Sequence, residues 1–448
     1  MNYSVVIYIL GWIMEIEAAF LALPGIVSAI YGEKGGFAFL WVALGSAVAG
    51  SAIILRKPKN MRFYLREGFV TVALSWILMS VIGCLPFVIN GDIPHFADAL
   101  FEMISGFTTT GATVVSDVEG LTKGSLFWRS FSHWIGGMGV LVFLLAIVPM
   151  AGGSHMNLMK AESPGPSVGK LVPKVRQTAK YLYIIYFALT MIEVIFLLFG
   201  GMNLFEALTT SFGTAGTGGF AIWNDGFVSV SPYNQWVVTI FMLLFGVNFG
   251  FYFLILTGKL RDALKFEEVR IYFIIVIAAA VFIFINLRHF ALYAPAEGIR
   301  QAFFQVASII TTTGFASADF NLWPETSRTI LVLLMFIGAC AGSTGGGIKV
   351  SRFIIACKSF IKEIISYLHP RSVKKIKIEG KPLEHETLRA TNVYFMTYMV
   401  IFAVSVLLVS IENKDLVTNF AAVAATFNNI GPGLSLVGPM ANFGHFTD

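Results

Sequence analysis

Thr108-Thr109-Thr110-Gly111-Ala112-Thr113 is the stretch that decides the fold of this chain. It is polar, it follows a short and mostly apolar run at residues 96–107, and long hydrophobic segments flank it on both sides. Irregular backbone at membrane depth must be enclosed by protein or line a water-filled cavity, because lipid cannot satisfy its polar groups. The stretch therefore predicts an enclosed loop inside a membrane protein.

The same pattern recurs three more times along the chain. Residues 311–315 (Thr-Thr-Thr-Gly-Phe) repeat it closely, residues 214–220 (Thr-Ala-Gly-Thr-Gly-Gly-Phe) loosely, and residues 428–432 (Asn-Asn-Ile-Gly-Pro) more loosely. The anchor glycines of the four loops are taken as Gly111, Gly218, Gly314 and Gly431, spaced by 107, 96 and 117 residues. One such run is usually explained by close helix packing in lipid. Its return at four similar places, each after a short helix, favours a shared functional site.

The composition indicates a polytopic membrane protein. Of the 448 residues, 56% are hydrophobic and only 13% are charged, whereas soluble domains carry about 25% charged residues. Many apolar runs reach the ~20 residues needed to cross a bilayer. The net charge of +5 does not suggest a nucleic-acid partner, because the basic residues fall between hydrophobic segments. The first 22 residues have no basic start and carry Glu15 and Glu17, so we expect a retained helix and not a cleaved signal.

The order of the hydrophobic segments predicts an all-α fold: an N-terminal helix pair, then four repeats of helix, pore loop and helix around a pseudo-fourfold pore. Each repeat contains a segment of ~10–13 residues, which is too short to span a bilayer and suggests a re-entrant helix. The predicted units are residues 1–66 (the N-terminal pair), 67–175, 176–268, 269–370 (with an intramembrane loop at 338–347) and 371–448, where the last inner helix is absent.

The distribution of basic residues predicts the orientation in the membrane. Residues 56–66, 160–180, 259–270 and 349–389 are basic and should face the cytoplasm. The stretches beside the four loops carry most of the acids between spans and should face outward. Further acids near the starts of the short helices are expected to cap helix N-termini or to attract cations: Asp98, Glu102, Glu206, Glu297 and Asp415.

The four loops have the chemistry of a cation filter. A short helix that points inward directs the negative end of its dipole toward the axis. Glycine allows backbone angles that turn carbonyl groups inward, and rings of carbonyls replace the water shell of a cation in potassium channel filters. Neutral oxygens in a wide ring suit a large monovalent ion.

These loops resemble those of the Trk/Ktr/HKT superfamily of potassium uptake proteins. Residues 134–139 (Trp-Ile-Gly-Gly-Met-Gly) and 342–349 (Gly-Ser-Thr-Gly-Gly-Gly-Ile-Lys) are similar to that family as well. The match covers nearly all of the chain, and the extra N-terminal helix pair makes it more similar to the bacterial Trk type than to the shorter Ktr type.

The resemblance implies a set of site residues and partners. The potassium ion would be held by Thr109, Thr110, Gly111, Gly216, Thr217, Gly218, Thr312, Thr313, Gly314, Asn429, Ile430 and Gly431. The gate below this filter would comprise Gly338, Gly342, Ser343, Thr344, Gly345, Gly346, Gly347 and Lys349. The family forms homodimers in the bacterial inner membrane and docks on a cytosolic ring of nucleotide-binding regulatory subunits of the Trk type. It also ends in a spanning helix with an arginine below the filter. This sequence stops at Asp448, before such a helix, so we expect the natural chain to continue.

Three alternatives remain open at this stage. A cation symporter of the same superfamily would couple flux to sodium or protons, and His133 is a candidate for a proton-linked role, whereas its neighbour Trp134 is better explained as an interfacial anchor. An intramembrane serine hydrolase would use Ser343 with a histidine. A membrane receptor or scaffold without transport would explain the basic connectors but not the four loops.

Overall fold

The computed structural model describes residues 1–61, 64–137, 139, 175–369 and 375–446. An N-terminal pair, α1 (Tyr3–Ile30) and α2 (Gly36–Ile54), precedes four units. Each unit opens with a long outer helix: α3 (Leu65–Asn90), α8 (Val175–Phe199), α13 (Glu267–His289) and α17 (His385–Val409). A short helix follows in each: α4 (Phe96–Phe107), α9 (Leu204–Ala215), α14 (Pro295–Ile310) and α18 (Leu416–Phe427). Inner helices follow the first three loops: α5 (Lys123–Gly137), α10 (Pro232–Phe245) with α11 (Phe249–Leu256), and α15 (Glu325–Ile337) with α16 (Val350–Leu368).

The remaining elements are short connectors. They are α12 (Leu260–Leu264), the 3-10 turns η1 (Phe320–Leu322), η2 (Ser410–Glu412) and η3 (Ser435–Val437), and a two-stranded antiparallel hairpin of β1 (Lys377–Ile378) and β2 (Lys381–Pro382). The hairpin was not expected from the sequence. It turns at Glu379 and Gly380, which both have positive φ.

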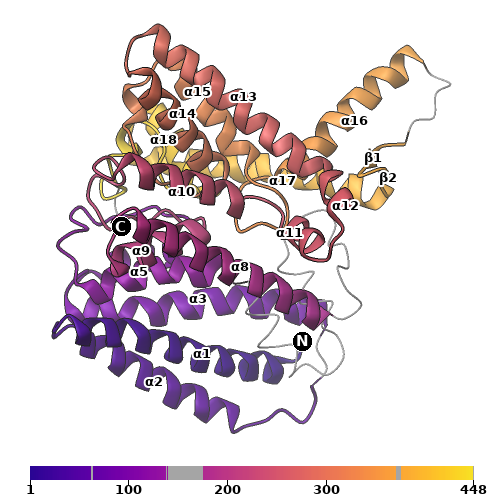
Figure 1. The fold of residues 1–448 in the computed structure, drawn as a ribbon. Coiled ribbons are helices and arrows are strands. Elements are labelled where there is room, and N and C mark those ends of the chain that lie inside the picture. The colour runs from indigo at the N-terminus through magenta and orange to yellow at the C-terminus, as the bar shows by residue number, and fades with distance from the viewer. Residues whose placement is uncertain (62–63, 138, 140–174, 370–374, 447–448) are drawn as a thin grey trace.

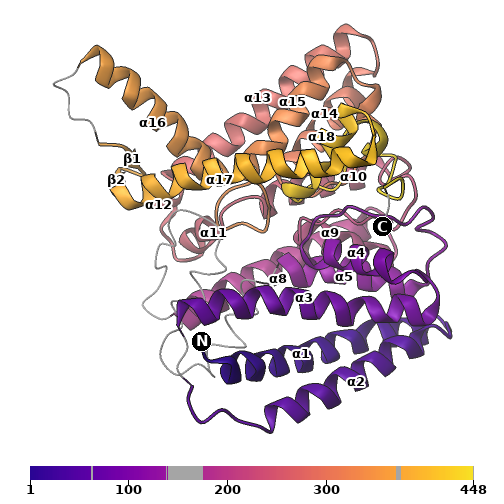
Figure 2. The ribbon, with the colours of Figure 1, turned by 180° about the vertical axis from the view of Figure 1, so that it is seen from behind.

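Six described helices are long and apolar enough to cross a membrane, or seven if the bent pair α10 and α11 counts as one span. These helices confirm the polytopic all-α class. In Figures 1 and 2 the N-terminus, α12 and the β1–β2 hairpin lie at the same end of the helix bundle. This common end carries the described parts of the basic segments that were predicted to face the cytoplasm.

The units pack in a cyclic order. Each outer helix packs on the short helix of its own unit, and each described inner helix packs on the short helix of the next unit: α5 on α9, α10 on α14, and α15 on α18. Aromatic pairs mark these three contacts, namely Phe131–Phe212 (5.3 Å), Trp236–Phe303 (6.0 Å) and Phe336–Phe420 (6.1 Å) between ring centroids. The first and second halves of the chain form two layers (Figure 1). The contacts of the inner helices therefore link the short helices α9, α14 and α18, and the loops that follow them, to the preceding unit.

One spanning helix differs from its prediction. The hydrophobic run of residues 236–257 predicts one continuous spanning helix, but α10 and α11 meet at 88° across a break of three residues. Asn248 begins α11 by accepting a hydrogen bond from the N–H of Gly250 at 2.8 Å, and asparagine is strongly favoured at helix N-caps. Gly246 faces the Tyr272 hydroxyl, where a Cβ would lie only 2.6 Å away. The prediction of one continuous helix was wrong because Asn248, within the hydrophobic run, is the N-cap of a second helix.

Candidate functional site

The four short helices all end in the same backbone turn. The second residue after each helix has positive φ: Thr109 (58°), Thr217 (52°), Thr312 (59°) and Asn429 (57°). The fourth residue after each helix is a glycine with positive φ: Gly111 (75°), Gly219 (82°), Gly314 (86°) and Gly431 (93°). Positive φ is a genuine outlier for a β-branched residue, and such strained residues cluster at functional sites. Three threonines have this strained conformation at equivalent positions, which indicates that the turn is part of a functional site.

The second loop is shifted by one residue from the register that the anchor glycine Gly218 predicted. The residue between the two positive-φ positions donates its N–H to the carbonyl five residues back, at 2.8–2.9 Å, in Thr110, Gly218, Thr313 and Ile430. Gly218 thus occupies the place of Thr110, and Thr217 that of Thr109. The choice of Gly218 as anchor was wrong, because Gly219 has the left-handed conformation. Gly216 falls at the helix C-cap, one residue before the turn.

The four loops close into a ring. A Cβ on Gly111 would collide with the carbonyl oxygen of Gly218, one on Gly219 with that of Thr313, and one on Gly314 with that of Ile430. The fourth contact returns to the start, because a Cβ on Gly431 would lie 2.9 Å from the carbonyl oxygen of Thr110. Hydrogen bonds also join the ends of the ring, since Asn429 Nδ2 donates to the Thr108 carbonyl at 3.1 Å. Each glycine therefore leaves room for the carbonyl of its neighbour.

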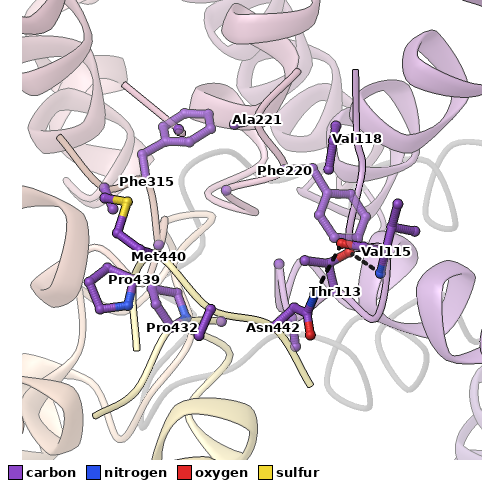
Figure 3. A pocket seen from close by; sticks show the side chains of 18 of the residues that line it. Thr113, Val115, Val118, Phe220, Ala221, Phe315, Pro432, Pro439, Met440 and Asn442 are labelled. Carbon is purple, nitrogen blue, oxygen red and sulfur yellow. Dashed lines mark hydrogen bonds between the residues drawn. The ribbon is translucent and has the colours of Figure 1, made fainter. Parts of the chain in front are cut away.

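A second belt of contacts joins the segments outside the ring. Asn224 accepts from the N–H of Val118 at 2.7 Å, Phe227 donates its N–H to Ala316 at 2.8 Å, and Phe443 donates its N–H to Thr113 at 2.8 Å. Asn321 and Ser435 complete the belt with two hydrogen bonds at 3.0 and 3.2 Å. The belt surrounds a cavity of about 150 Å³ whose lining includes Gly111, Gly219, Gly314 and Gly431. Figure 3 shows side chains from separate loops around this space, among them Phe220, Phe315, Pro432 and Thr113.

The first loop rests on a buried ion pair. The Arg129 guanidinium lies 2.6 Å from Glu102 Oε1, and these side chains are 2% and 0% exposed. Glu102 also accepts from the Thr113 hydroxyl at 2.9 Å and from the N–H of Val114 at 3.2 Å. The guanidinium lies over the ring of Phe220 in the second loop, 4.2 Å from its centre. Glu102 therefore anchors the loop from behind, and its prediction as a cap or an attractor of cations was wrong.

The third loop has a neutral anchor at the equivalent position. Gln305 occupies the position in the third loop that Glu102 occupies in the first. Its amide oxygen can accept from the N–H groups of Ser317 and Ala318 at 3.0 and 3.3 Å. Ser308 adds a hydrogen bond to the Phe315 carbonyl at 2.6 Å. The side chain of Gln301 accepts from the Ser317 hydroxyl. Charge is thus not required for this backbone turn.

His133 joins the first unit to the second loop. One ring nitrogen, Nδ1, lies 2.8 Å from the Gly106 carbonyl, and Nε2 lies 3.2 Å from the N–H of Phe220. The carbonyl requires a donor and the N–H requires an acceptor, so these partners assign the neutral Nδ1–H tautomer. A Cβ on Gly218 would enter the His133 ring. This explains why the second loop has glycine where the first and third have threonine.

The acids at the short helices have different roles. Glu206 forms a capping box with Asn203, and Asp415 accepts from the Thr418 N–H at 3.0 Å. The pKa of Asp415 lies below its usual range because the Thr418 hydroxyl and N–H donate to the carboxylate. The N-cap positions of α4 and α14 have no side-chain cap, so capping was confirmed for only these two acids.

The glycine-rich break of the third unit lies beneath the ring. The N–H of Gly346 donates to the Thr312 hydroxyl at 2.6 Å. A Cβ on Gly345 would lie 2.8 Å from the Thr311 carbonyl, and one on Gly346 would lie 2.7 Å from that of Asn428. The predicted break was therefore found, and it contacts the third and fourth loops. Positive φ occurs at Gly338, Gly342, Gly347 and Lys349.

Side chains of the break are engaged within it. Lys349 is 2% exposed and donates to the Gly345 carbonyl. Thr344 donates to the Phe245 carbonyl at 3.3 Å. Ser343 donates its hydroxyl to the Cys340 carbonyl at 2.6 Å. The hydroxyl proton of Ser343 is therefore directed at this carbonyl, whereas the serine hydrolase alternative requires it to be directed at a histidine.

Fold and site together define a multi-pass membrane protein in which four re-entrant loops meet in one ring. The family model for TrkH, described as a cation transport protein, matches residues 37–447. The Trk system potassium uptake protein TrkH of Escherichia coli (strain K12) is 36% identical over 98% of this chain and 92% of its own length. TrkH of Vibrio parahaemolyticus is 34% identical over 100% of this chain and 94% of its own length.

A solved structure agrees with these matches. The crystal structure of the potassium transporter TrkH from Vibrio parahaemolyticus superposes with a TM-score of 0.88 at 32% identity, covering 99% of this chain and 93% of that one. The chain belongs to the TrkH family of cation transport proteins and is a multi-pass protein of the inner membrane.

Proposed function

We propose that this protein takes up potassium ions through a filter formed by its four loops. The observation that carries the proposal is the closed ring, in which each of four strained turns leaves room for a carbonyl of the next. The TrkH relatives are named potassium uptake proteins. With the register corrected, the filter residues are Thr109, Thr110, Gly111, Thr217, Gly218, Gly219, Thr312, Thr313, Gly314, Asn429, Ile430 and Gly431.

The chemistry of the ring supports a large monovalent cation. The described residues contain no group of three or more His, Cys, Asp or Glu that could hold a metal ion. The oxygens that the turns offer are neutral carbonyls, threonine hydroxyls and an asparagine amide. The C-terminal ends of α4, α9, α14 and α18 add the negative ends of four helix dipoles. Neutral carbonyl oxygens can replace the water shell of a potassium ion.

We further propose that the segment of residues 338–349 is the gate. Its contacts with Thr312 and with the carbonyls of Thr311 and Asn428 support this role. Several of its residues have positive φ, so a short segment can change course without unfolding the helices on either side. Movement of Gly345 and Gly346 away from the ring would open the space beneath it.

We also propose partners for this protein on the basis of its family. The relatives are named as parts of a Trk system, and we propose a homodimer that docks on a cytosolic ring of nucleotide-binding subunits. The end of the bundle with α12 and the β1–β2 hairpin is the candidate docking end. We keep the predicted division into a helix pair (1–66) and four repeats (67–175, 176–268, 269–370 and 371–448).

Rubidium influx tests the function. The gene is expressed in a bacterium that lacks its own potassium uptake systems, and the membrane content of the protein is measured in parallel. We expect saturable influx that excess potassium suppresses and excess sodium does not. Background influx with the protein present in the membrane would remove the proposal. Influx that requires external sodium or follows the pH gradient would instead favour the coupled symporter.

A further inference from the structure

The glycine-rich segment is held at both ends by one carboxylate. Glu268 lies in the first turn of α13 and is 5% exposed. Its Oε1 accepts from the N–H of Ala341 at 2.7 Å and from the N–H of Ser351 at 3.0 Å. The first donor lies early in the segment, and the second lies at the N-terminus of α16. One oxygen therefore fixes two points that are ten residues apart in the chain.

Burial of the Glu268 side chain opposes its ionisation, whereas its hydrogen bonds from backbone N–H groups favour the ionised carboxylate. The first N–H groups of a helix have no partner within the helix, and the helix dipole attracts negative charge to that end. Hydrogen bonds from backbone N–H to an ionised acceptor are stronger than those between neutral groups. Lys349, which is buried in the same segment, adds a favourable electrostatic interaction with Glu268.

Other ties of the segment are neutral, and two of them lead to the break between α10 and α11. The N–H of Cys340 donates to the Gly246 carbonyl at 3.1 Å, and the N–H of Phe249 donates to the Gly342 carbonyl at 2.9 Å. A third neutral tie joins the start of α16 to the segment directly, because the N–H of Val350 donates to the Ala339 carbonyl at 3.0 Å. Among these ties, the carboxylate alone connects the segment, the start of α16 and the outer helix α13.

We propose that Glu268 is a positioning residue that keeps residues 338–349 docked beneath the ring, and that loss of its carboxylate releases the segment. The inference rests on the proposed gating role of that segment. Glu268 touches neither the ring nor its cavity, so it acts through the backbone of the segment. Release of the segment raises ion flux in the absence of any regulatory subunit.

The cysteines of the chain provide a readout that is independent of flux. Cys340 lies within the segment and is fully buried, Cys84 is fully buried in α3, and Cys357 is exposed on α16. In a Cys357→Ala background, a membrane-permeant maleimide reports release of the segment at Cys340 and global unfolding at Cys84. Peptide mass spectrometry of the full-length protein in liposomes measures both rates in one sample.

The test compares three variants in that background. We expect Glu268→Ala to speed the labelling of Cys340 at least tenfold without changing that of Cys84, and to raise rubidium flux. Glu268→Gln keeps an oxygen but loses the charge, so its labelling rate should fall between those of Glu268→Ala and the parent. Glu267→Ala is the matched control, because this neighbouring acid pairs with Lys358 at 2.5 Å and does not contact the segment. It should leave the rate at Cys340 unchanged.

Each result separates the inference from the proposed gate. Unchanged protection of Cys340 in both Glu268 variants overturns the inference, as does equal acceleration at Cys84. Faster labelling of Cys340 with unchanged flux supports the role of Glu268 but removes the gate assignment. If Glu268→Ala does not fold, the Gln variant decides the question.

Discussion

The first and third loops have the same backbone and different supports. Both contain Thr-Thr-Thr-Gly, both begin with a pair of threonine hydroxyls 2.7–2.8 Å apart, and both place positive φ at the same two positions. Behind the first loop lies the Glu102–Arg129 ion pair, whereas neutral Gln305 and Ser308 lie behind the third. The comparison shows that contacts within the ring, and not the groups behind it, are what the loops share.

The largest expected effect tests whether the ring glycines are equivalent. Serine at Gly111, Gly219 or Gly314 would force a side chain against the neighbouring carbonyl, so each variant should reduce the selectivity for potassium over sodium by about tenfold or more. That factor corresponds to ~1.4 kcal/mol of discrimination. Competition between sodium and rubidium influx in cells measures this ratio.

A glycine outside the ring provides the matched control. Gly91 also has positive φ (83°), but a Cβ there would meet no atom within 4 Å. Gly91→Ser therefore introduces similar backbone strain without displacing a carbonyl, and it should keep normal selectivity. Loss of selectivity at Gly111 but not at Gly314 would break the equivalence of the two loops.

The second prediction concerns the charge behind the first loop. Removing one partner of a buried ion pair costs about 3–5 kcal/mol, whereas loss of a neutral buried hydrogen-bonding group costs about 1–3 kcal/mol. Glu102→Ala should therefore lower the thermal stability of the purified protein in detergent more than Gln305→Ala does. The two Thr-Gly turns have positive φ at the same two positions, so the difference in stability reports on the anchor behind each turn.

A double variant separates charge from shape at this anchor. Glu102→Gln leaves Arg129 buried and uncompensated, and Glu102→Gln with Arg129→Met removes both charges. A buried pair can often be replaced by uncharged residues at little net cost, so the double variant should be more stable than Glu102→Gln alone. Equal stability of the single and double variants would show that the charge of Arg129 does not matter.

The sequence predicted the class, the four loops and the glycine-rich break, because each has a local pattern. It missed features that depend on distant partners. Arg129 is a charged residue in the inner helix that follows the first loop, and a charge in a membrane helix could have been singled out. Glu268 could not, because it lies in a basic segment and acquires its role only when the backbone of residues 341 and 351 folds onto it. The register of the second loop failed because Gly218 and Gly219 are adjacent, and only the His133 ring and the backbone angles distinguish them.

The smallest expected effect comes from one hydroxyl. Ser105 and Ser308 occupy equivalent positions, four residues before the first strained residue of their loops. Ser308 donates to the Phe315 carbonyl, whereas the buried Ser105 hydroxyl has no hydrogen-bond partner in the part of the chain that the structure describes. Gly213 and Ala425 occupy this place in the other two loops, so a hydroxyl is not a requirement of the turn.

Alanine at these two serines should therefore change the stability of the protein by different amounts. Ser308→Ala should destabilise the protein by about 1 kcal/mol, the net value of a typical hydrogen bond, and Ser105→Ala should be neutral or slightly stabilising. The thermal unfolding temperatures of the two variants measure the difference under identical conditions. An equal loss in both would mean that Ser105 has a partner in the folded protein, and the supports of the two loops would then be more alike than their contacts indicate.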